Sequence, residues 1–412
     1  MPAIPRSEEA CGQRDGRPVA APMLRGMPAR ALTITAVLAV VALTLRAAIG
    51  MEPGLDYFTD ASQAIDLLAA GNVSGFLQIQ PLMGSFSLIV RAPFVRLVLY
   101  EDLDVVYYVG ALPLLAGGIV LGLALRRHLE RVGQGPAVQW LVAALAILNP
   151  LTFRALHWGH PEEILAGALC VGAVLAALWD RRILSAVLLG LALATKQWAL
   201  LAVLPVLLAT PSRRLGVLLV AGVIAAALTL PGILSSPQAF SSVSQNAALQ
   251  TGSDGVATPY NVFWPLGSRE PTPQGDRYFV PIWASTISHP LIVLVALPLS
   301  LLLWRRPDRR RDDALLLLAL LFSLRCVLDT WNIDYYAVPF VLALLSWEAV
   351  RRPGVPRLTI AAILLLSVSY WGEHVRFYGQ TLEDAPWLFA LYMAWVLPLT
   401  AWLARTLYRP RT

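Results

Sequence analysis

Apolar segments of about 15 to 22 residues recur along the chain, separated by short breaks that are rich in Arg or in Pro and Gly. A membrane-spanning α-helix needs roughly 20 such residues, because each adds about 1.5 Å across a hydrocarbon core of about 30 Å. The pattern therefore predicts an all-α polytopic membrane protein with about twelve transmembrane helices, within a range of about 10 to 13. The predicted spans are residues 31–50, 104–125, 136–152, 162–179, 183–195, 197–210, 214–232, 285–304, 313–328, 335–350, 357–371 and 387–404.

The composition agrees with a membrane location and explains the positive charge. Of the residues, 57% are apolar and 14% are charged, and the mean hydropathy is +0.63, whereas a soluble domain needs more charge to cover its surface. The formal net charge is +6, but the arginines gather in short clusters at predicted helix ends, as the positive-inside rule describes. Because topology explains this charge, we expect no nucleic-acid partner.

The arginine clusters also decide the predicted topology. Residues 1–30 are polar and are predicted to form a disordered cytoplasmic tail, followed by a single transmembrane domain at 31–404. A signal peptide is the alternative interpretation of 31–50, since its apolar run is short. Residues 405–412 form a second cytoplasmic tail. We therefore expect a multi-pass protein of the cell (plasma) membrane with both termini inside.

Residues 51–103 are predicted to form a long first extracytoplasmic loop. If 82–100 crossed the membrane, Arg126 and its neighbours would lie outside, against the positive-inside rule. We therefore expect two helices of this loop, at about 60–70 and 82–99, to lie in the membrane interface.

Two further segments depart from simple spans. The pair at 183–195 and 197–210 is short, which favours tilted or half-penetrating helices that meet at Lys196 and Gln197. Residues 233–284 form a second long extracytoplasmic loop, rich in Ser, Pro, Gly and aromatic residues, and its length is typical of a binding or lid element.

With this topology, the unusual polar residues fall on the outer side, beginning with Asp56 and Asp60 in the first loop. A carboxylate at a membrane surface is partly desolvated, which raises its proton affinity and suits a general base acting on a sugar hydroxyl. A solvated loop is the alternative for Asp56, and N-capping of the next helix is the alternative for Asp60.

The second polar group is His157, His160, Glu162 and Glu163, around the start of the helix at 162–179. The two glutamates suit the positive end of a helix dipole, which by itself explains them structurally. The histidines favour recognition of a substrate headgroup or hydroxyls. Metal binding is the alternative, although no third ligand has a diagnostic spacing.

Lys196 is the single lysine of the chain and interrupts an apolar stretch, where a lysine costs about 2.5 to 3.5 kcal/mol. It either extends toward the interface or binds an anionic phosphate as a point charge. Asp334 and Tyr335 begin a late helix, where aromatic residues stack on a sugar, line a lipid groove or simply belong to the interfacial belt.

The order of these motifs resembles the GT-C superfamily of polyprenyl-phosphate-sugar-dependent glycosyltransferases, and is most similar to the family 87 mannosyltransferase-like membrane proteins of actinobacteria. The resemblance covers most of the predicted membrane region. At His160 this chain departs from a family pattern that often has Gln. The segments that carry the resemblance are 56–60, 159–163, 189–198 and 334–336.

The resemblance implies an inverting hexosyltransferase, with Asp56 as the catalytic base and Asp60 as the neighbouring candidate. Lys196, helped by Arg91 or Arg96, would hold the phosphate of the donor. The implied partners are a polyprenyl-phosphate sugar, with mannose expected, a glycolipid or cell-envelope glycan acceptor, and membrane lipids. No cofactor is implied, and the scheme does not require a divalent metal.

A transporter or lipid flippase is the main alternative function. Transporters place ionisable residues near the bilayer midplane, on broken helices within inverted repeats. The break at Lys196 favours this alternative, whereas the position of the other polar residues at one surface favours transfer chemistry. A non-catalytic membrane scaffold is the third possibility.

Overall fold

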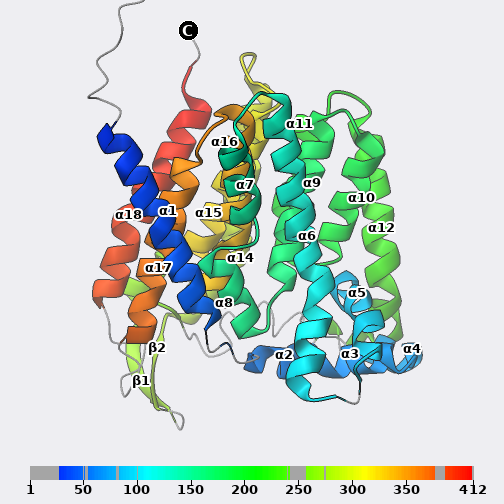
Figure 1. The fold of residues 1–412 in the computed structure, drawn as a ribbon. Coiled ribbons are helices and arrows are strands. Elements are labelled where there is room, and N and C mark those ends of the chain that lie inside the picture. The colour runs from blue at the N-terminus through cyan, green and yellow to red at the C-terminus, as the bar shows by residue number, and fades with distance from the viewer. Residues whose placement is uncertain are drawn as a thin grey trace, which may run out of the picture.

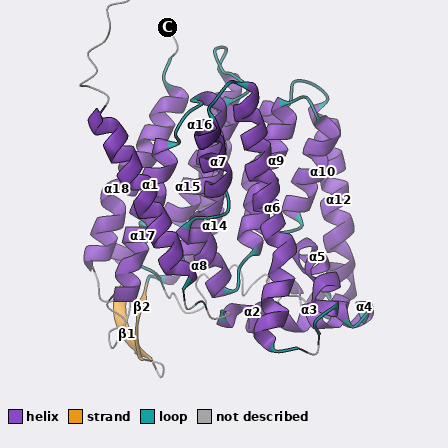
Figure 2. Cartoon of the chain, in the orientation of Figure 1, coloured by secondary structure: helices purple, strands orange, loops and turns teal. Residues whose placement is uncertain are grey.

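The computed structural model describes residues 27–49, 51, 54–79, 83–99, 101–238, 240–241, 257–272, 275–375 and 386–410. Within these residues the chain is mostly helical, with one short pair of strands (Figure 2). The long helices run between the two ends of one bundle, and short helices lie across one of these ends (Figure 1). The predicted helical membrane architecture is therefore confirmed in outline, except that the all-α expectation did not include the strands.

Six helical segments in the described residues are long and apolar enough to cross a membrane. Many of their exposed side chains are apolar, as a surface in contact with lipid tails requires. Length and composition alone therefore do not confirm the predicted number of about twelve spans. The six are α1 (Met27–Ala48), α6 (Leu103–Arg131), α7 (Pro136–Leu145) together with α8 (Pro150–Trp158), α12 (Arg214–Ser235), α14 (Ile282–Arg305) and α18 (Pro386–Tyr408).

The other predicted spans correspond to shorter helices. Nearly all side chains of three of them, α9, α15 and α16, are buried, so these three form the centre of the bundle. Their apolar surface packs against other helices instead of lipid. The shorter helices are α9 (Glu162–Leu178), α10 (Arg182–Leu193), α11 (Val203–Ala209), α15 (Asp313–Leu328), α16 (Val338–Arg351) and α17 (Arg357–Val375).

Arginines from several predicted clusters gather at one end of the bundle, which we call the arginine-rich end. Arg306 donates a hydrogen bond to the carbonyl of Leu407 (3.0 Å), which joins the ends of α14 and α18. Arg311 donates to the carbonyls of Ala177 (2.6 Å) and Ala209 (2.8 Å), at the ends of α9 and α11. These guanidinium groups satisfy carbonyls at the negative ends of helix dipoles. α1 begins and α18 ends at this side (Figure 1).

α10 and α11 form a short helical hairpin that begins and ends at the arginine-rich end. α10 begins just after α9 has reached the arginine-rich end, and it has only 12 residues. The chain then turns at Lys196 and returns through a 3₁₀ turn (Gln197–Ala202) and α11 to Ala209, which Arg311 contacts. The chain thus turns back after two short helices, and their half-penetrating position in a membrane stays a prediction.

The first predicted outer loop forms a helical platform at the end opposite to the arginines (Figure 1). The platform packs around an apolar cluster that is separate from the main core and includes Ile65 and Leu88 together with Tyr107 of α6. The helices predicted at 60–70 and 82–99 are present as α3 and α5, accompanied by two helices of six residues each. The platform consists of α2 (Leu55–Asp60), α3 (Ser62–Ala69), α4 (Val73–Gln78) and α5 (Ser85–Arg96).

The predicted N-cap at Asp60 is wrong. α2 ends at Asp60, and the residue before α3 is Ala61, which provides no side-chain cap. The carboxylate of Asp60 instead accepts a hydrogen bond from the hydroxyl of Thr59 (2.9 Å).

The loop predicted at 233–284 lies partly outside the described residues, and its described part contains the strands. β1 (Ser268–Thr272) and β2 (Gly275–Phe279) form an antiparallel hairpin. The segment before the hairpin is fixed by Asn261, whose Nδ2 donates to the carbonyl of Thr330 (2.9 Å). This contact connects the segment before the hairpin to the link that follows α15.

Glu348 of α16 caps the start of α17, and we predict that Glu348→Ala lowers the free energy of unfolding by about 3 kcal/mol. Its Oε2 accepts from both N and Oγ1 of Thr359 (2.7 Å each), and its Oε1 accepts from Leu358 N (3.1 Å). Alanine leaves these donors without a charged acceptor. Thermal unfolding of the detergent-purified protein measures the effect. The exposed Glu130→Ala variant is the control and should shift stability by less than about 0.5 kcal/mol.

Candidate active site

Two close backbone contacts bring the platform against the turn between α8 and α9. Gly159 ends α8 in the left-handed region, with φ of 91°. Gly54 packs directly on Trp158, since a Cβ on Gly54 would lie 2.1 Å from the carbonyl carbon of Trp158. A larger residue at either position would push the two segments apart. The contact places Asp56 of α2 opposite His160.

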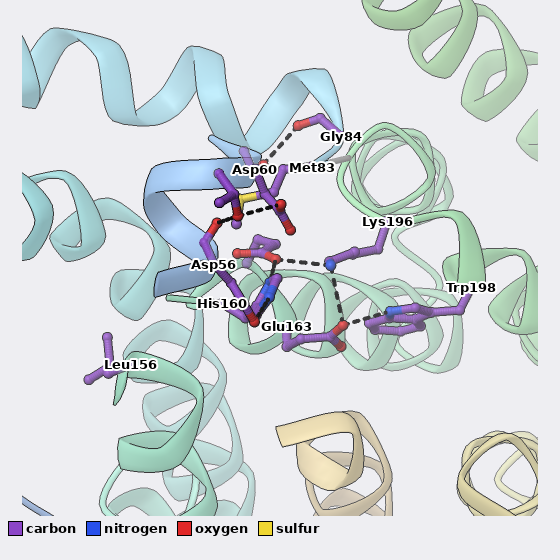
Figure 3. Close-up of polar contacts among 12 residues, drawn as sticks. Asp56, Asp60, Met83, Gly84, Leu156, His160, Glu163, Lys196 and Trp198 are labelled. Atoms are coloured by element: carbon purple, nitrogen blue, oxygen red, sulfur yellow. Dashed lines mark hydrogen bonds and ion pairs between the residues drawn. The ribbon is translucent and has the colours of Figure 1, made fainter. Parts of the chain in front are cut away.

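Six ionisable side chains form a series of alternating charge, which we call the ion chain: in order of contact, Asp56, His160, Glu162, Lys196, Glu163 and Arg325. Figure 3 labels four of them, Asp56, His160, Lys196 and Glu163. Asp56 Oδ2 lies 3.2 Å from His160 Nε2, and His160 Nδ1 lies 2.7 Å from Glu162 Oε1. Lys196 Nζ lies 2.9 Å from Glu162 Oε1 and 3.5 Å from Glu163 Oε1. Arg325 Nη2 lies 3.5 Å from Glu163 Oε1.

The ion chain is buried at one end and accessible at the other. The side chains of Glu162 and Glu163 are 0% exposed and that of Arg325 is 6% exposed, whereas that of Asp56 is 38% exposed. Buried charges are tolerated when they are paired, and here three carboxylates face three basic groups. The ion chain is therefore neutral when His160 carries a proton.

His160 is protonated at neutral pH. Both of its ring nitrogens face carboxylate oxygens, so both must donate a hydrogen bond. Burial lowers the pKa of His160, but the charge of Glu162 and the hydrogen bonds to Asp56 and Glu162 outweigh burial and raise the pKa to about 9. The ring of Tyr335 stacks on the imidazolium, with centroids 4.5 Å apart.

Glu162 and Glu163 begin α9, as their predicted place at the positive end of a helix dipole requires. Trp198 Nε1 donates to Glu163 Oε1 (3.1 Å). The Oε2 atom of each glutamate is buried and has no hydrogen-bond partner in the described part of the chain. Both carboxylates therefore depend on the neighbouring positive charges for their stability.

Lys196 lies at the turn between α10 and the 3₁₀ turn Gln197–Ala202, and it forms ion pairs with two carboxylates. The expected contact between Lys196 and a donor phosphate stays a prediction. The main chain beside it is also fixed, because Gly84 N donates to Thr195 O (3.2 Å) and Phe86 N donates to Ala194 O (3.0 Å). The carbonyl end of α10 thus meets the amide end of α5, an arrangement in which opposite dipole ends are adjacent.

Asp60 lies one turn after Asp56 on α2. Figure 3 shows both carboxylates on the side of α2 that faces His160 and Lys196. Burial raises the pKa of Asp60 above its ordinary value, and the hydrogen bond from Thr59 opposes this shift. The structure therefore brings both predicted acids to one place, with Asp56 in contact with the ion chain and Asp60 beside it.

The 3₁₀ turn Asp334–Ala337, which comes late in the sequence, borders the site. Besides the stacking of Tyr335 on His160, Asp334 forms an ion pair with Arg154 of α8. The guanidinium of Arg154 also lies over the ring of Trp158. Both residues predicted from this late segment are thus at the site.

His157 does not belong to the ion chain. It packs edge-on against Trp158, with ring centroids 5.8 Å apart. In the described residues, no three His, Cys, Asp or Glu side chains are grouped so as to hold a metal ion. The metal alternative for His157 and His160 thus lacks a third ligand there.

Arg91 and Arg96 of α5 differ from their expected role beside a phosphate. Arg96 is exposed in the last turn of the helix. Arg91 is 0% exposed, so protein encloses its side chain, and the position of α5 in the membrane interface stays a prediction. Its guanidinium packs against the ring of Tyr57 inside the platform. Neither arginine forms an ion pair with a member of the ion chain in the described residues, and we do not include Arg96 in the site.

Three residues of the site, Arg325, Arg154 and Trp198, are not among those predicted from the sequence. Arg325 closes the ion chain, Trp198 donates to it, and Arg154 neutralises a carboxylate of the late turn. A signal for the two arginines was present. Each is a single arginine away from the clusters, on the side of the predicted topology where the positive-inside rule leaves few.

The fold and the site define a multi-pass membrane protein whose buried ionisable residues converge at one end of the bundle, opposite to its arginine clusters. The profile of glycosyltransferase family 87 matches residues 82–330, which is more than half of the chain. The chain therefore belongs to glycosyltransferase family 87, and the resemblance read from its motifs is confirmed. No curated protein matches the sequence. The matched region contains five of the six members of the ion chain, whereas Asp56 precedes it.

Removing one charge from the ion chain should destabilise the protein more than removing a pair. We predict that Lys196→Met lowers the free energy of unfolding by about 3 to 5 kcal/mol, because it leaves two buried carboxylates facing too little positive charge. The double variant Lys196→Met with Glu162→Gln should recover most of this loss. Thermal unfolding measures both, with the exposed Arg181→Met as control. A double variant less stable than Lys196→Met would contradict the pairing.

The raised pKa of His160 makes stability depend on pH. The contribution of the protonated ring is fully present below its ordinary pKa of 6.5 and is lost as the pH rises through about 9. We expect a loss on the order of 3 kcal/mol. Thermal unfolding midpoints from about pH 6 to about pH 10 should fall more steeply for wild type than for His160→Gln. Parallel curves would show that His160 is not the titrating group.

Proposed function

We propose that this family 87 glycosyltransferase moves mannose from a polyprenyl-phosphate donor to a hydroxyl group of a glycolipid or cell-envelope glycan. Family membership supports the transferase activity. One observation supports the site above all others: the buried ion chain ends in a carboxylate, Asp56, that is 38% exposed. A base that must reach a bulky acceptor needs this combination of a fixed and an accessible end.

In the proposed reaction, Asp56 accepts the proton of the acceptor hydroxyl as the hydroxyl oxygen attacks the anomeric carbon of the donor sugar. The new carbon–oxygen bond forms while the bond to the phosphate oxygen breaks, and polyprenyl phosphate leaves with the electron pair. A single displacement of this kind inverts the anomeric configuration. His160 holds Oδ2 of Asp56 and leaves the other carboxylate oxygen to face the substrate.

We propose that the other residues of the ion chain hold the carboxylate of Asp56 in place. Glu162 orients His160 and keeps it charged, and Lys196 balances Glu162. Charges fixed before the substrate arrives need no reorganisation during the reaction, which is the main advantage of a preorganised site. Asp60, one turn away, is the second candidate for a catalytic carboxylate.

We further propose a GT-C-type topology with about twelve membrane segments, in which the α10–α11 pair enters and returns. The arginine-rich end would face the cytoplasm, following the positive-inside rule, so both termini would be inside. The ion chain and the platform would then lie on the extracytoplasmic side. The residues at the start of a long outer loop would meet a lipid-linked donor in the outer leaflet.

We predict that Asp56→Asn lowers the rate of mannose transfer by about 10²- to 10⁴-fold, because an amide cannot accept the proton. The assay follows radiolabelled mannose from polyprenyl phosphate to an extracted glycolipid acceptor, with purified protein in liposomes. Asp66→Asn, at an exposed position of α3, is the matched control and should keep wild-type activity. Equal rates for wild type and Asp56→Asn would remove Asp56 from the role of base.

The same liposomes test which sugar donor the protein uses and whether it is a transferase or a transporter. Polyprenyl-phosphate glucose and a nucleotide-linked mannose serve as alternative donors, and only the lipid-linked mannose should give product. For the transporter or flippase alternative, liposomes without any donor are loaded with labelled lipid. Net movement of this lipid in the absence of transfer would support that alternative and contradict the proposal.

A further inference from the structure

Arg91 of α5 carries a positive charge that is fully enclosed by protein. Such a charge costs several kcal/mol unless other groups compensate it. Its Nε and Nη2 atoms have no hydrogen-bond partner in the described residues, and its Nη1 lies 3.9 Å from the sulfur of Met83. The carboxylate of Glu162 acts on the guanidinium only through space. Within the described residues, ordinary ion pairing therefore does not account for this arginine.

Two tyrosine rings provide the compensation. The guanidinium carbon of Arg91 lies 4.8 Å from the ring centroid of Tyr57 and 5.9 Å from that of Tyr107. The two rings also contact each other, with centroids 4.9 Å apart. A desolvated cation–π contact contributes about 2 kcal/mol, more than the same contact at a surface. Arg91 thus joins α5 to α2 through Tyr57 and to α6 through Tyr107.

The tyrosines connect this cluster to the site. Tyr57 is 1% exposed and directly follows Asp56 in α2, so the position of its ring constrains the position of the carboxylate. The hydroxyl of Tyr107 donates to the carbonyl of Leu156 in α8, close to the turn that carries His160. The same cation therefore fixes both partners of the contact between Asp56 and His160.

α5 also contacts the backbone next to Lys196, in the buried part of the ion chain. Its first residues bind the carbonyls of Ala194 and Thr195, next to Lys196. One helix of 12 residues thus contacts the segment of Asp56 near its middle and the segment of Lys196 at its start. A displacement of α5 would change the spacing between the accessible and the buried ends of the ion chain.

We propose that Arg91 is a positioning residue, which acts through the rings of Tyr57 and Tyr107 to hold Asp56 against His160. The inference rests on the proposed role of Asp56 and assigns Arg91 a role other than contact with the donor phosphate. It requires the planar cation, since a guanidinium stacks on aromatic faces in a way that an ammonium does not reproduce fully.

The kinetic test compares Arg91→Met, Arg91→Lys and the exposed control Arg96→Met in the mannose-transfer assay. We expect kcat of Arg91→Met to fall about 10- to 100-fold with KM changed less than about twofold, because a small displacement of the base affects the chemical step. Arg91→Lys should restore part of kcat, and Arg96→Met should match wild type. A rise in KM with unchanged kcat would instead indicate binding of the donor and would overturn the inference.

A double-mutant cycle tests the route through Tyr57. Tyr57→Phe keeps the ring and should retain nearly wild-type kcat, whereas Tyr57→Leu should lower kcat as much as Arg91→Met does. The combined variant Arg91→Met with Tyr57→Leu should be no slower than either single variant, because both changes break one interaction. Additive losses would show that Arg91 does not act through this ring.

Thiol labelling tests the position without any catalysis. In a Cys11→Ser background, Asp56→Cys is labelled with a membrane-impermeant maleimide, while the other two cysteines, Cys170 and Cys326, are buried. We expect Arg91→Met, or Arg91→Lys if the methionine variant does not fold, to change the labelling rate at residue 56 at least about threefold. A change in labelling, combined with no mannose transfer by the wild-type protein, would reject the proposed function but keep the positioning role. Unchanged labelling in a folded variant would overturn that role.

Discussion

The structure depends on one constraint, which is that ionic groups removed from water must balance one another. Glu162 and Glu163 are fully buried at the start of a central helix, and neither is stable without the positive charges beside it. Lys196 and Arg325 provide two of these charges and protonated His160 provides a third. A neutral ion chain then requires one more acid, and the accessible Asp56 provides it.

Helix ends supply the local framework for this balance. The two glutamates lie at the amide end of α9, where the dipole favours negative charge. The short hairpin of α10 and α11 turns at Lys196, which brings the ammonium group within contact distance of those glutamates. Close approach at Gly54 and Gly84 then allows the platform backbone to reach both places. The position of the charged residues in the site thus depends on where these helices begin and end.

Arginine has two separate roles in the molecule. At the arginine-rich end, Arg306 and Arg311 bind the last carbonyls of neighbouring helices, so arginines of the predicted helix-end clusters also join the bundle. At the other end, Arg325 neutralises a buried acid and Arg91 stacks on aromatic rings. The amino-acid composition does not distinguish these side chains. Only their surroundings show whether an arginine joins helix ends or organises the site.

The sequence by itself determined the membrane class, the positions of most helices, the break at Lys196 and the acidic start of α9, because each depends on residues close together in the chain. It also selected Asp56 and His160 as candidates. Tertiary structure alone decided that these two, 104 residues apart, touch each other, and that Asp334 pairs with Arg154. It also decided that Arg91 is buried. Contacts of this kind depend on how distant helices pack, which no local pattern of apolar and polar residues encodes.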